Sequence, residues 1–113
     1  MAKYDDRLDQ YFGALADPTR RAVVARLQRG PATVGELAGP HDMALPTFLA
    51  HLRKLEAAGL VTTEKRGRTR YCALAPDALL PAQDWLDAQR ALWTGRLDRL
   101  DDYVINLMKD RNR

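Results

Sequence analysis

The 113-residue sequence contains no serine, a single cysteine and two histidines. Without serine there is no serine nucleophile, and with Cys72 alone there is no intramolecular disulfide, which fits a reducing compartment. Cys72, His41 and His51 offer too few candidates for a metal cage of three or four Cys and His ligands. The sequence also lacks an apolar run of the ~18–20 residues that span a membrane, and an apolar N-terminal signal segment. We therefore expect a soluble, cytoplasmic protein without a metal or cofactor.

The charge is mild overall and concentrated in one segment. The chain carries a formal net charge of +3, and residues 61–74 hold Lys65, Arg66, Arg68 and Arg70 against one acidic residue. This segment therefore has an excess equal to that of the whole chain. Such a concentration is typical of a polyanion-binding surface, and the alternative is a solvated hairpin with a basic tip.

Apolar periodicity and capping signals predict four helices before residue 60. They are expected at residues 3–16, 18–30, 33–38 and 44–58. Asp17 before Pro18 predicts the start of the second helix, and Thr33 with Glu36 matches a capping box for the third. The fourth helix has one apolar face, which comprises Leu45, Phe48, Leu52 and Leu55, and it ends at Gly59. The third and fourth helices, residues 33–58, predict a helix-turn-helix.

Two strand-like runs at about 60–66 and 69–74 flank Gly67-Arg68, a candidate two-residue hairpin turn. A basic hairpin that directly follows a recognition-type helix indicates a winged helix-turn-helix with its wing at about 60–74. The predicted fold is a single domain over residues 1–113. It is mostly α-helical with a small β-hairpin, in the order of four helices, two strands and a final helix.

The final helix is expected at about residues 81–108. Its heptad-like apolar seam comprises Trp93, Leu97, Leu100, Val104 and Leu107. Such a helix would span ~42 Å, whereas a compact chain of this length has a radius of gyration of ~13 Å. A partner helix would cover the seam, and the first helix offers a similar stripe in Tyr4, Leu8 and Phe12. The alternative is a helix that wraps its own core with a frayed end.

Three stretches of the chain together resemble the ArsR/SmtB family of winged-helix repressors. Residues 15–21 (LADPTRR) resemble the start of that family's second helix, residues 43–61 its recognition helix and residues 65–71 its wing. The resemblance implies a homodimeric repressor of a pseudo-palindromic operator, with dimerisation through the first and last helices. The chain departs from the family at Leu49 and Ala50, where serine and lysine are common. It also lacks the family's metal-sensing Cys-x-Cys motif and has no histidine in its last helix, so it resembles the metal-independent branch.

Polar and small residues on the far side of the fourth helix, in the wing and at the start of the second helix are the candidate DNA contacts. They are Thr47, Ala50, His51, Arg53 and Lys54, then Arg66, Arg68 and Arg70, and finally Thr19 and Arg21. Arg20 has two equal interpretations, a phosphate contact or an ion pair inside the protein.

The sequence therefore predicts a homodimeric, DNA-binding transcriptional regulator that recognises double-stranded DNA and acts as a repressor. Leu49 and Ala50 leave open a winged-helix protein-interaction module that has lost specific DNA binding. An enzyme is not expected, because no serine, histidine pair or glycine-rich phosphate loop could organise a reaction. The operator and any small-molecule effector are not indicated by the sequence.

Overall fold

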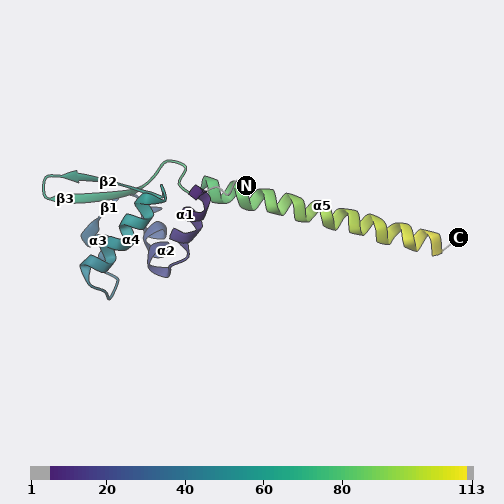
Figure 1. Cartoon of the computed structure of the whole chain (residues 1–113), viewed down its shortest axis with the longest axis horizontal. Coiled ribbons are helices and arrows are strands. Elements are labelled where there is room, and N and C mark those ends of the chain that lie inside the picture. Colours follow the sequence, from purple (N-terminus) through teal and green to yellow (C-terminus); the bar gives the residue numbers. More distant parts are fainter. Residues whose placement is uncertain (1–5, 112–113) are drawn as a thin grey trace. The chain divides into compact units, whose positions relative to one another are not determined.

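A computed structural model describes residues 6–111, which form two compact units, one reaching Leu80 and the other beginning at Pro81 (Figure 1). The first unit contains α1 (Asp6–Leu15), α2 (Pro18–Leu27), β1 (Ala32–Thr33), α3 (Val34–Ala38), α4 (Leu45–Ala57), β2 (Val61–Arg66) and β3 (Thr69–Leu74). The second unit is a single long helix, since α5 spans Leu80–Arg111. The predicted mostly helical fold with its β-hairpin is confirmed, and residues 3–5 of the predicted first helix lie outside the described residues.

The predicted capping signals fix where α2 and α3 begin. The carboxylate of Asp17 accepts a hydrogen bond of 3.0 Å from the backbone N–H of Arg20, and Pro18 occupies the first turn of α2. At α3, the Thr33 hydroxyl accepts from the N–H of Glu36 at 3.1 Å, while Glu36 accepts from the N–H of Thr33 at 3.3 Å. This reciprocal pair is the capping box that the sequence indicates.

The sheet has three antiparallel strands in the order β1-β3-β2. The β2–β3 hairpin runs in register from Val61 opposite Leu74 to Arg66 opposite Thr69. Gly67 takes a φ of +63°, the left-handed conformation that a tight hairpin turn favours at this position. The third strand, β1, was not predicted, because its two residues are too few to show an alternating pattern and it is defined only by pairing with β3.

The core of the first unit lies where α2, α4 and the sheet meet. Phe48, Leu55, Leu60, Val23 and Cys72 are its largest fully buried side chains, and Leu52 is buried with them. Phe48, Leu52 and Leu55 confirm the predicted apolar face of α4. The prediction for Leu45 was wrong, because its side chain is 53% exposed at the first residue of α4, where the core no longer covers the helix.

On α1, the buried residues are Tyr11 and Ala14 rather than the predicted apolar stripe. Phe12 is exposed and Leu8 is partly covered. Tyr4, the first residue of that stripe, lies outside the described residues. The two described stripe residues thus remain largely outside the core that α1 helps to build.

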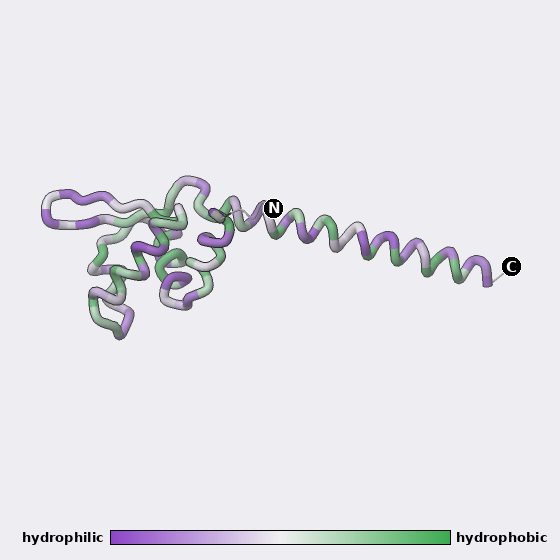
Figure 2. Tube along the Cα trace, viewed as in Figure 1, coloured by the Kyte–Doolittle hydropathy of each residue, from purple (hydrophilic) through white to green (hydrophobic). Residues whose placement is uncertain are grey.

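The helix α5 is longer than predicted at its C-terminal end. Its 32 residues correspond to ~48 Å of helix, and apolar and hydrophilic residues alternate along it (Figure 2). All five residues of the predicted seam are exposed, namely Trp93, Leu97, Leu100, Val104 and Leu107. Among the described residues, no helix combines the length and the apolar character that crossing a membrane requires.

Candidate nucleic-acid interface

The outer face of α4 carries four of the candidate DNA contacts. Thr47, Ala50, Arg53 and Lys54 are all exposed, opposite the buried Phe48, Leu52 and Leu55. Within residues 6–111, neither Arg53 nor Lys54 has an ion-pair partner. This face therefore presents two uncompensated cations beside a hydroxyl and a small side chain.

The wing carries its cations on both faces of the β2–β3 ribbon. Because Lys65 lies opposite Arg70 and Arg66 opposite Thr69, Arg66 and Arg70 project to opposite faces. Arg66 contacts the Glu64 carboxylate at 3.3 Å and lies 5.5 Å from the centre of the Tyr71 ring. Arg68 is exposed in the turn and has no ion-pair partner among the described residues. Hydrophilic residues dominate the outer part of the hairpin (Figure 2).

A groove of about 360 Å³ separates α4 from the wing. Its lining comprises Leu49, Leu52, Arg53, Glu56, Thr63 and Arg70. Arg70 donates from Nη1 to the Thr63 hydroxyl at 3.0 Å, and this hydroxyl donates to Oε2 of Glu56 at 3.0 Å. Arg53 of α4 and Arg70 of the wing thus line one groove, and a chain of two hydrogen bonds joins the two elements.

Glu56 and Thr63 were missed by the sequence analysis. Thr63 shares a ribbon face with the buried residues Val61 and Cys72, so its partly covered hydroxyl is a polar group on the inward side. That inward polar position is the signal that strand alternation offers. Glu56 gave no signal, because its role depends on the approach of the wing.

The start of α2 is organised by Arg20, whose side chain is 9% exposed. Its Nε donates to the carbonyl of Ala14 at 2.7 Å, its Nη2 to the carbonyl of Gly13 at 3.2 Å and its Nη1 lies 2.9 Å from Nδ1 of His51. Arg20 thus lies inside the protein, as one of the two interpretations expects, but its hydrogen-bond partners are two carbonyl groups and His51 rather than an acidic side chain. The guanidinium caps the carbonyl end of α1, where the helix dipole favours a cation.

The two other candidates in this region differ in their surroundings. Arg21 is exposed and donates to the Leu15 carbonyl at 2.9 Å, and Thr19 is partly covered. Asp17 keeps its carboxylate on the first turn of α2, and the backbone N–H of Arg20 lowers the pKa of Asp17 below its ordinary value. His51, on α4, joins this group because its Nδ1 also lies 3.8 Å from Oδ2 of Asp17.

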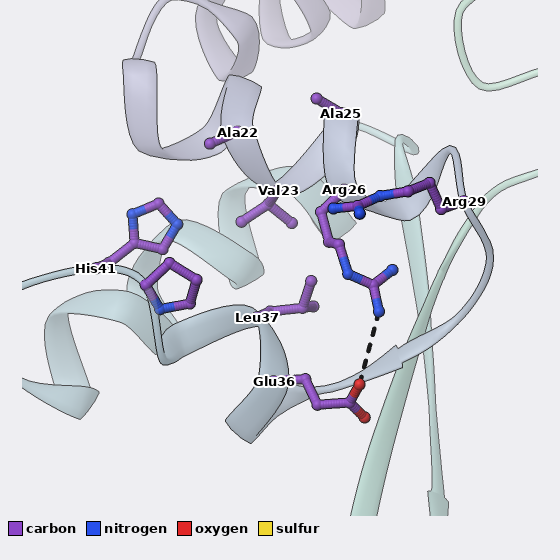
Figure 3. Close-up of a pocket in the computed structure, with 9 residues that line it drawn as sticks. Ala22, Val23, Ala25, Arg26, Arg29, Glu36, Leu37 and His41 are labelled. Atoms are coloured by element: carbon purple, nitrogen blue, oxygen red, sulfur yellow. Dashed lines mark ion pairs between the residues drawn. The ribbon is translucent and has the colours of Figure 1, made fainter.

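A second hollow, of about 440 Å³, lies between α2 and α3 and contains none of the candidate DNA contacts (Figure 3). Ala22, Val23, Ala25, Leu37 and Pro40 form its apolar lining, with Arg26, Arg29, Glu36 and His41 as its charged or polar members. Arg26 and Glu36 form an ion pair of 3.6 Å that joins α2 to α3. Within residues 6–111, no group of three or more His, Cys, Asp or Glu side chains is arranged to hold a metal ion.

Comparisons with known proteins agree with this geometry. A family model described as a helix-turn-helix domain matches residues 15–64. The HTH-type transcriptional regulator Rv2034 of Mycobacterium tuberculosis is 40% identical over 89 residues, which cover 79% of this chain and 80% of that protein.

Two solved structures extend the likeness to the fold. The crystal structure of the ArsR family transcriptional regulator RHA00566 is 52% identical with a TM-score of 0.77, and the match covers 83% of this chain and 97% of that one. A homodimeric winged helix-turn-helix DNA-binding domain from Mycobacterium bovis, described as a possible ArsR-family regulator, is 28% identical with a TM-score of 0.62. That match covers 81% of this chain and 94% of the other. The chain thus belongs to the ArsR/SmtB family of winged helix-turn-helix proteins, and it is a DNA-binding transcriptional regulator rather than an enzyme.

Proposed function

We propose that this regulator is a homodimeric repressor whose two winged units bind successive major grooves of a pseudo-palindromic operator. The observation that carries the proposal is the groove between α4 and the wing, where Arg53 and Arg70 come together from distant parts of the sequence. Paired cations on a helix and a hairpin fit the major groove and its flanking phosphates. The proposal therefore extends DNA binding, a property of the family, to particular residues.

The exposed side chains suggest separate roles. Thr47 and Ala50 suit contacts to base edges, Arg53 suits guanine or phosphate, and Lys54 suits phosphate. Arg66, Arg68 and Arg70 would hold the flanking backbone from the wing. Thr19 and Arg21 would contact phosphates at the start of α2, and His51 would contribute from the side of α4.

Dimerisation is proposed through α5 and α1. The seam of α5 leaves large apolar side chains exposed, including Trp93, Leu97 and Leu100, and Leu8 and Phe12 of α1 are incompletely covered. Exposed apolar side chains in such number are typical of a protein interface. A two-fold dimer would place its two α4 helices about one helical turn of DNA apart, ~34 Å, which predicts a pseudo-palindromic site.

Repression needs no further surface, because a protein bound across a promoter blocks RNA polymerase by occupancy. We also propose that no metal is the inducer. Cys72 is buried in the sheet and His51 is engaged by Arg20, so neither side chain is available as a ligand without rearrangement. A regulator works where its DNA lies, which we take to be the cytoplasm.

The test is selection of bound duplexes from a random-sequence library, followed by anisotropy titration of the selected duplex. We expect two inverted half-sites about 10 base pairs apart, centre to centre, and an affinity that falls steeply with salt. Arg53→Gln should weaken binding to the selected duplex, whereas Arg90→Gln on α5 should not. Failure to enrich any sequence would favour the alternative, a protein-interaction module that has lost specific DNA binding.

A further inference from the structure

The contact between Arg20 and His51 determines the chemistry that His51 offers. Arg20 Nη1 and His51 Nδ1 are 2.9 Å apart, which is a hydrogen-bond distance. A guanidinium group has only donors, so Nδ1 must be the acceptor. An imidazole that accepts at Nδ1 is uncharged and carries its proton on Nε2.

The carboxylate of Asp17 does not compete for that nitrogen. Its Oδ2 is 3.8 Å from Nδ1, which exceeds hydrogen-bond distance, and the same oxygen already accepts from the backbone N–H of Arg20 at 3.0 Å. A proton on Nδ1 would instead face the Nη1–H group of the Arg20 guanidinium, so that two donors would oppose each other. The geometry around Nδ1 therefore favours an acceptor at this nitrogen.

Arg20 is itself held rigidly. Two of its nitrogens donate to the carbonyls of Ala14 and Gly13 at the end of α1, and the side chain is almost fully buried. All three guanidinium-group nitrogens thus have acceptors, and the planar fork fixes the direction in which Nη1 points. A lysine, which carries one nitrogen, could not serve three acceptors in this planar arrangement.

The other ring nitrogen of His51 faces outward. Among the described residues, Tyr11 Oη is the one buried side-chain N or O atom that lacks a hydrogen-bond partner. His51 Nε2 also has no partner there, so it must reach solvent, consistent with an 18% exposed side chain. His51 lies one helical turn from Thr47 and from Lys54, so it borders the exposed face of α4 that carries these candidate DNA contacts.

We propose that Arg20 is a positioning residue that holds His51 as an uncharged Nε2–H donor, which α4 presents to an oxygen or nitrogen acceptor of the operator. The donor role rests on the proposed function, whereas the tautomer does not depend on DNA. His51 would then contribute a directional hydrogen bond to DNA binding rather than a positive charge.

The tautomer is tested on the free, full-length protein by long-range ¹H–¹⁵N NMR correlation of the histidine rings at neutral pH. We expect the pattern of the neutral Nε2–H tautomer for His51 in the wild type, and a mixture of tautomers in Arg20→Lys. The second histidine, His41, lies in the turn and stacks on Phe48, so its ring signals provide an internal control that should not change. A wild-type His51 protonated on Nδ1, or a pattern identical in wild type and Arg20→Lys, would overturn the positioning role.

The donor role is tested with two matched variants on the duplex that the wild type selects. His51→Gln places an amide N–H near the position of Nε2, whereas His51→Asn keeps an oxygen that can accept from Arg20 and has no donor at Nε2. We expect His51→Asn to bind about five- to tenfold more weakly than His51→Gln, the effect of one neutral hydrogen bond. Because no charge is removed, both variants should keep the wild-type dependence on salt.

The outcomes separate the two proposals. Equal affinities of the two variants, or a reduced salt dependence in both, would show that His51 is not a neutral donor. If the wild type selects no sequence, the proposed function and the donor role fail together, and the NMR result still decides whether Arg20 sets the tautomer.

Discussion

Arg70, on the second strand of the wing, donates a hydrogen bond of 3.0 Å to the hydroxyl of Thr63 on the first strand. The same hydroxyl donates a second hydrogen bond, of 3.0 Å, to Glu56 of α4. The wing and the recognition helix are therefore joined by side chains as well as by the chain that connects them. This link gives Arg70 a defined direction beside Arg53.

Removing this link should weaken DNA binding with little effect on folding. Thr63→Val keeps the size and the β-branched shape of the side chain but neither accepts from Arg70 nor donates to Glu56. We expect an affinity about fivefold lower, by the usual effect of a neutral hydrogen bond, measured by anisotropy on the selected duplex. Thr62→Val is the matched control, because Thr62 is exposed and projects from the opposite face of the same strand. Equal affinities for the two variants would contradict the positioning of Arg70.

The cation at the tip of the wing should act through charge alone. Arg68 is exposed without an ion-pair partner among the described residues, so Arg68→Ala should reduce the slope of log affinity against log salt by about one. Arg66→Ala should reduce it less, because Glu64 at 3.3 Å already neutralises part of the Arg66 charge. Titrations at several salt concentrations measure both slopes. An unchanged slope in Arg68→Ala would exclude the wing tip from the interface.

A charge in the seam of α5 should break the dimer. Leu97 is 40% exposed, so Leu97→Glu places a carboxylate in a surface that we propose is covered by a second copy. Sedimentation velocity should then show a monomer, and the circular dichroism spectrum should stay helical. Asp102→Lys is the control, about 140° away around the helix at 100° per residue, and it should remain a dimer. A dimeric Leu97→Glu would remove the seam from the interface.

Two helix caps should make the protein less stable in acid. The hydrogen bond from the backbone N–H of Arg20 lowers the pKa of Asp17. Hydrogen bonds from the backbone and the hydroxyl of Thr33 lower the pKa of Glu36. A carboxyl group with a lower pKa in the folded state stabilises the fold above its unfolded pKa, about 4, and this stabilisation is lost as the pH falls through the folded value. Urea midpoints should therefore fall with acidification below about pH 4. Glu36→Gln should show a smaller fall, and parallel curves for the variant and the wild type would contradict the role of Glu36.

The sequence predicted elements whose signals are local. Asp17 and Thr33 marked the starts of α2 and α3, Gly67 marked the hairpin turn, and the apolar spacing from Phe48 to Leu55 defined the buried face of α4. Each of these signals acts within a few residues, so the chain alone displays it. Family resemblance added the expectation of a homodimer on a pseudo-palindromic operator.

Other features depend on parts of the chain that meet only in the fold. Arg20 allowed two equal interpretations, a phosphate contact or an ion pair inside the protein. In the fold the end of α1 and His51 enclose it, and the residue it contacts on α4 is 31 positions away. Glu56 gained its role from the approach of Thr63. Leu45 fitted the apolar pattern of α4, but it is the first residue of that helix and is 53% exposed. Periodicity gives the direction of a side chain, whereas its burial depends on what lies opposite.

The short strand β1 has a practical consequence for exchanging parts between regulators. Thr33 faces Tyr71 of β3 and also caps α3, while Ala32 faces Cys72. A wing transplanted alone would leave β3 without its pairing to β1. It would also remove the strand that holds Thr33, the N-cap residue of α3, in place. The smallest module that keeps the pairing of all three strands runs from residue 32 to residue 74. Ala75 belongs with it, because its N–H donates to the carbonyl of Leu60 at 2.9 Å, so chimeras should be cut outside residues 32–75.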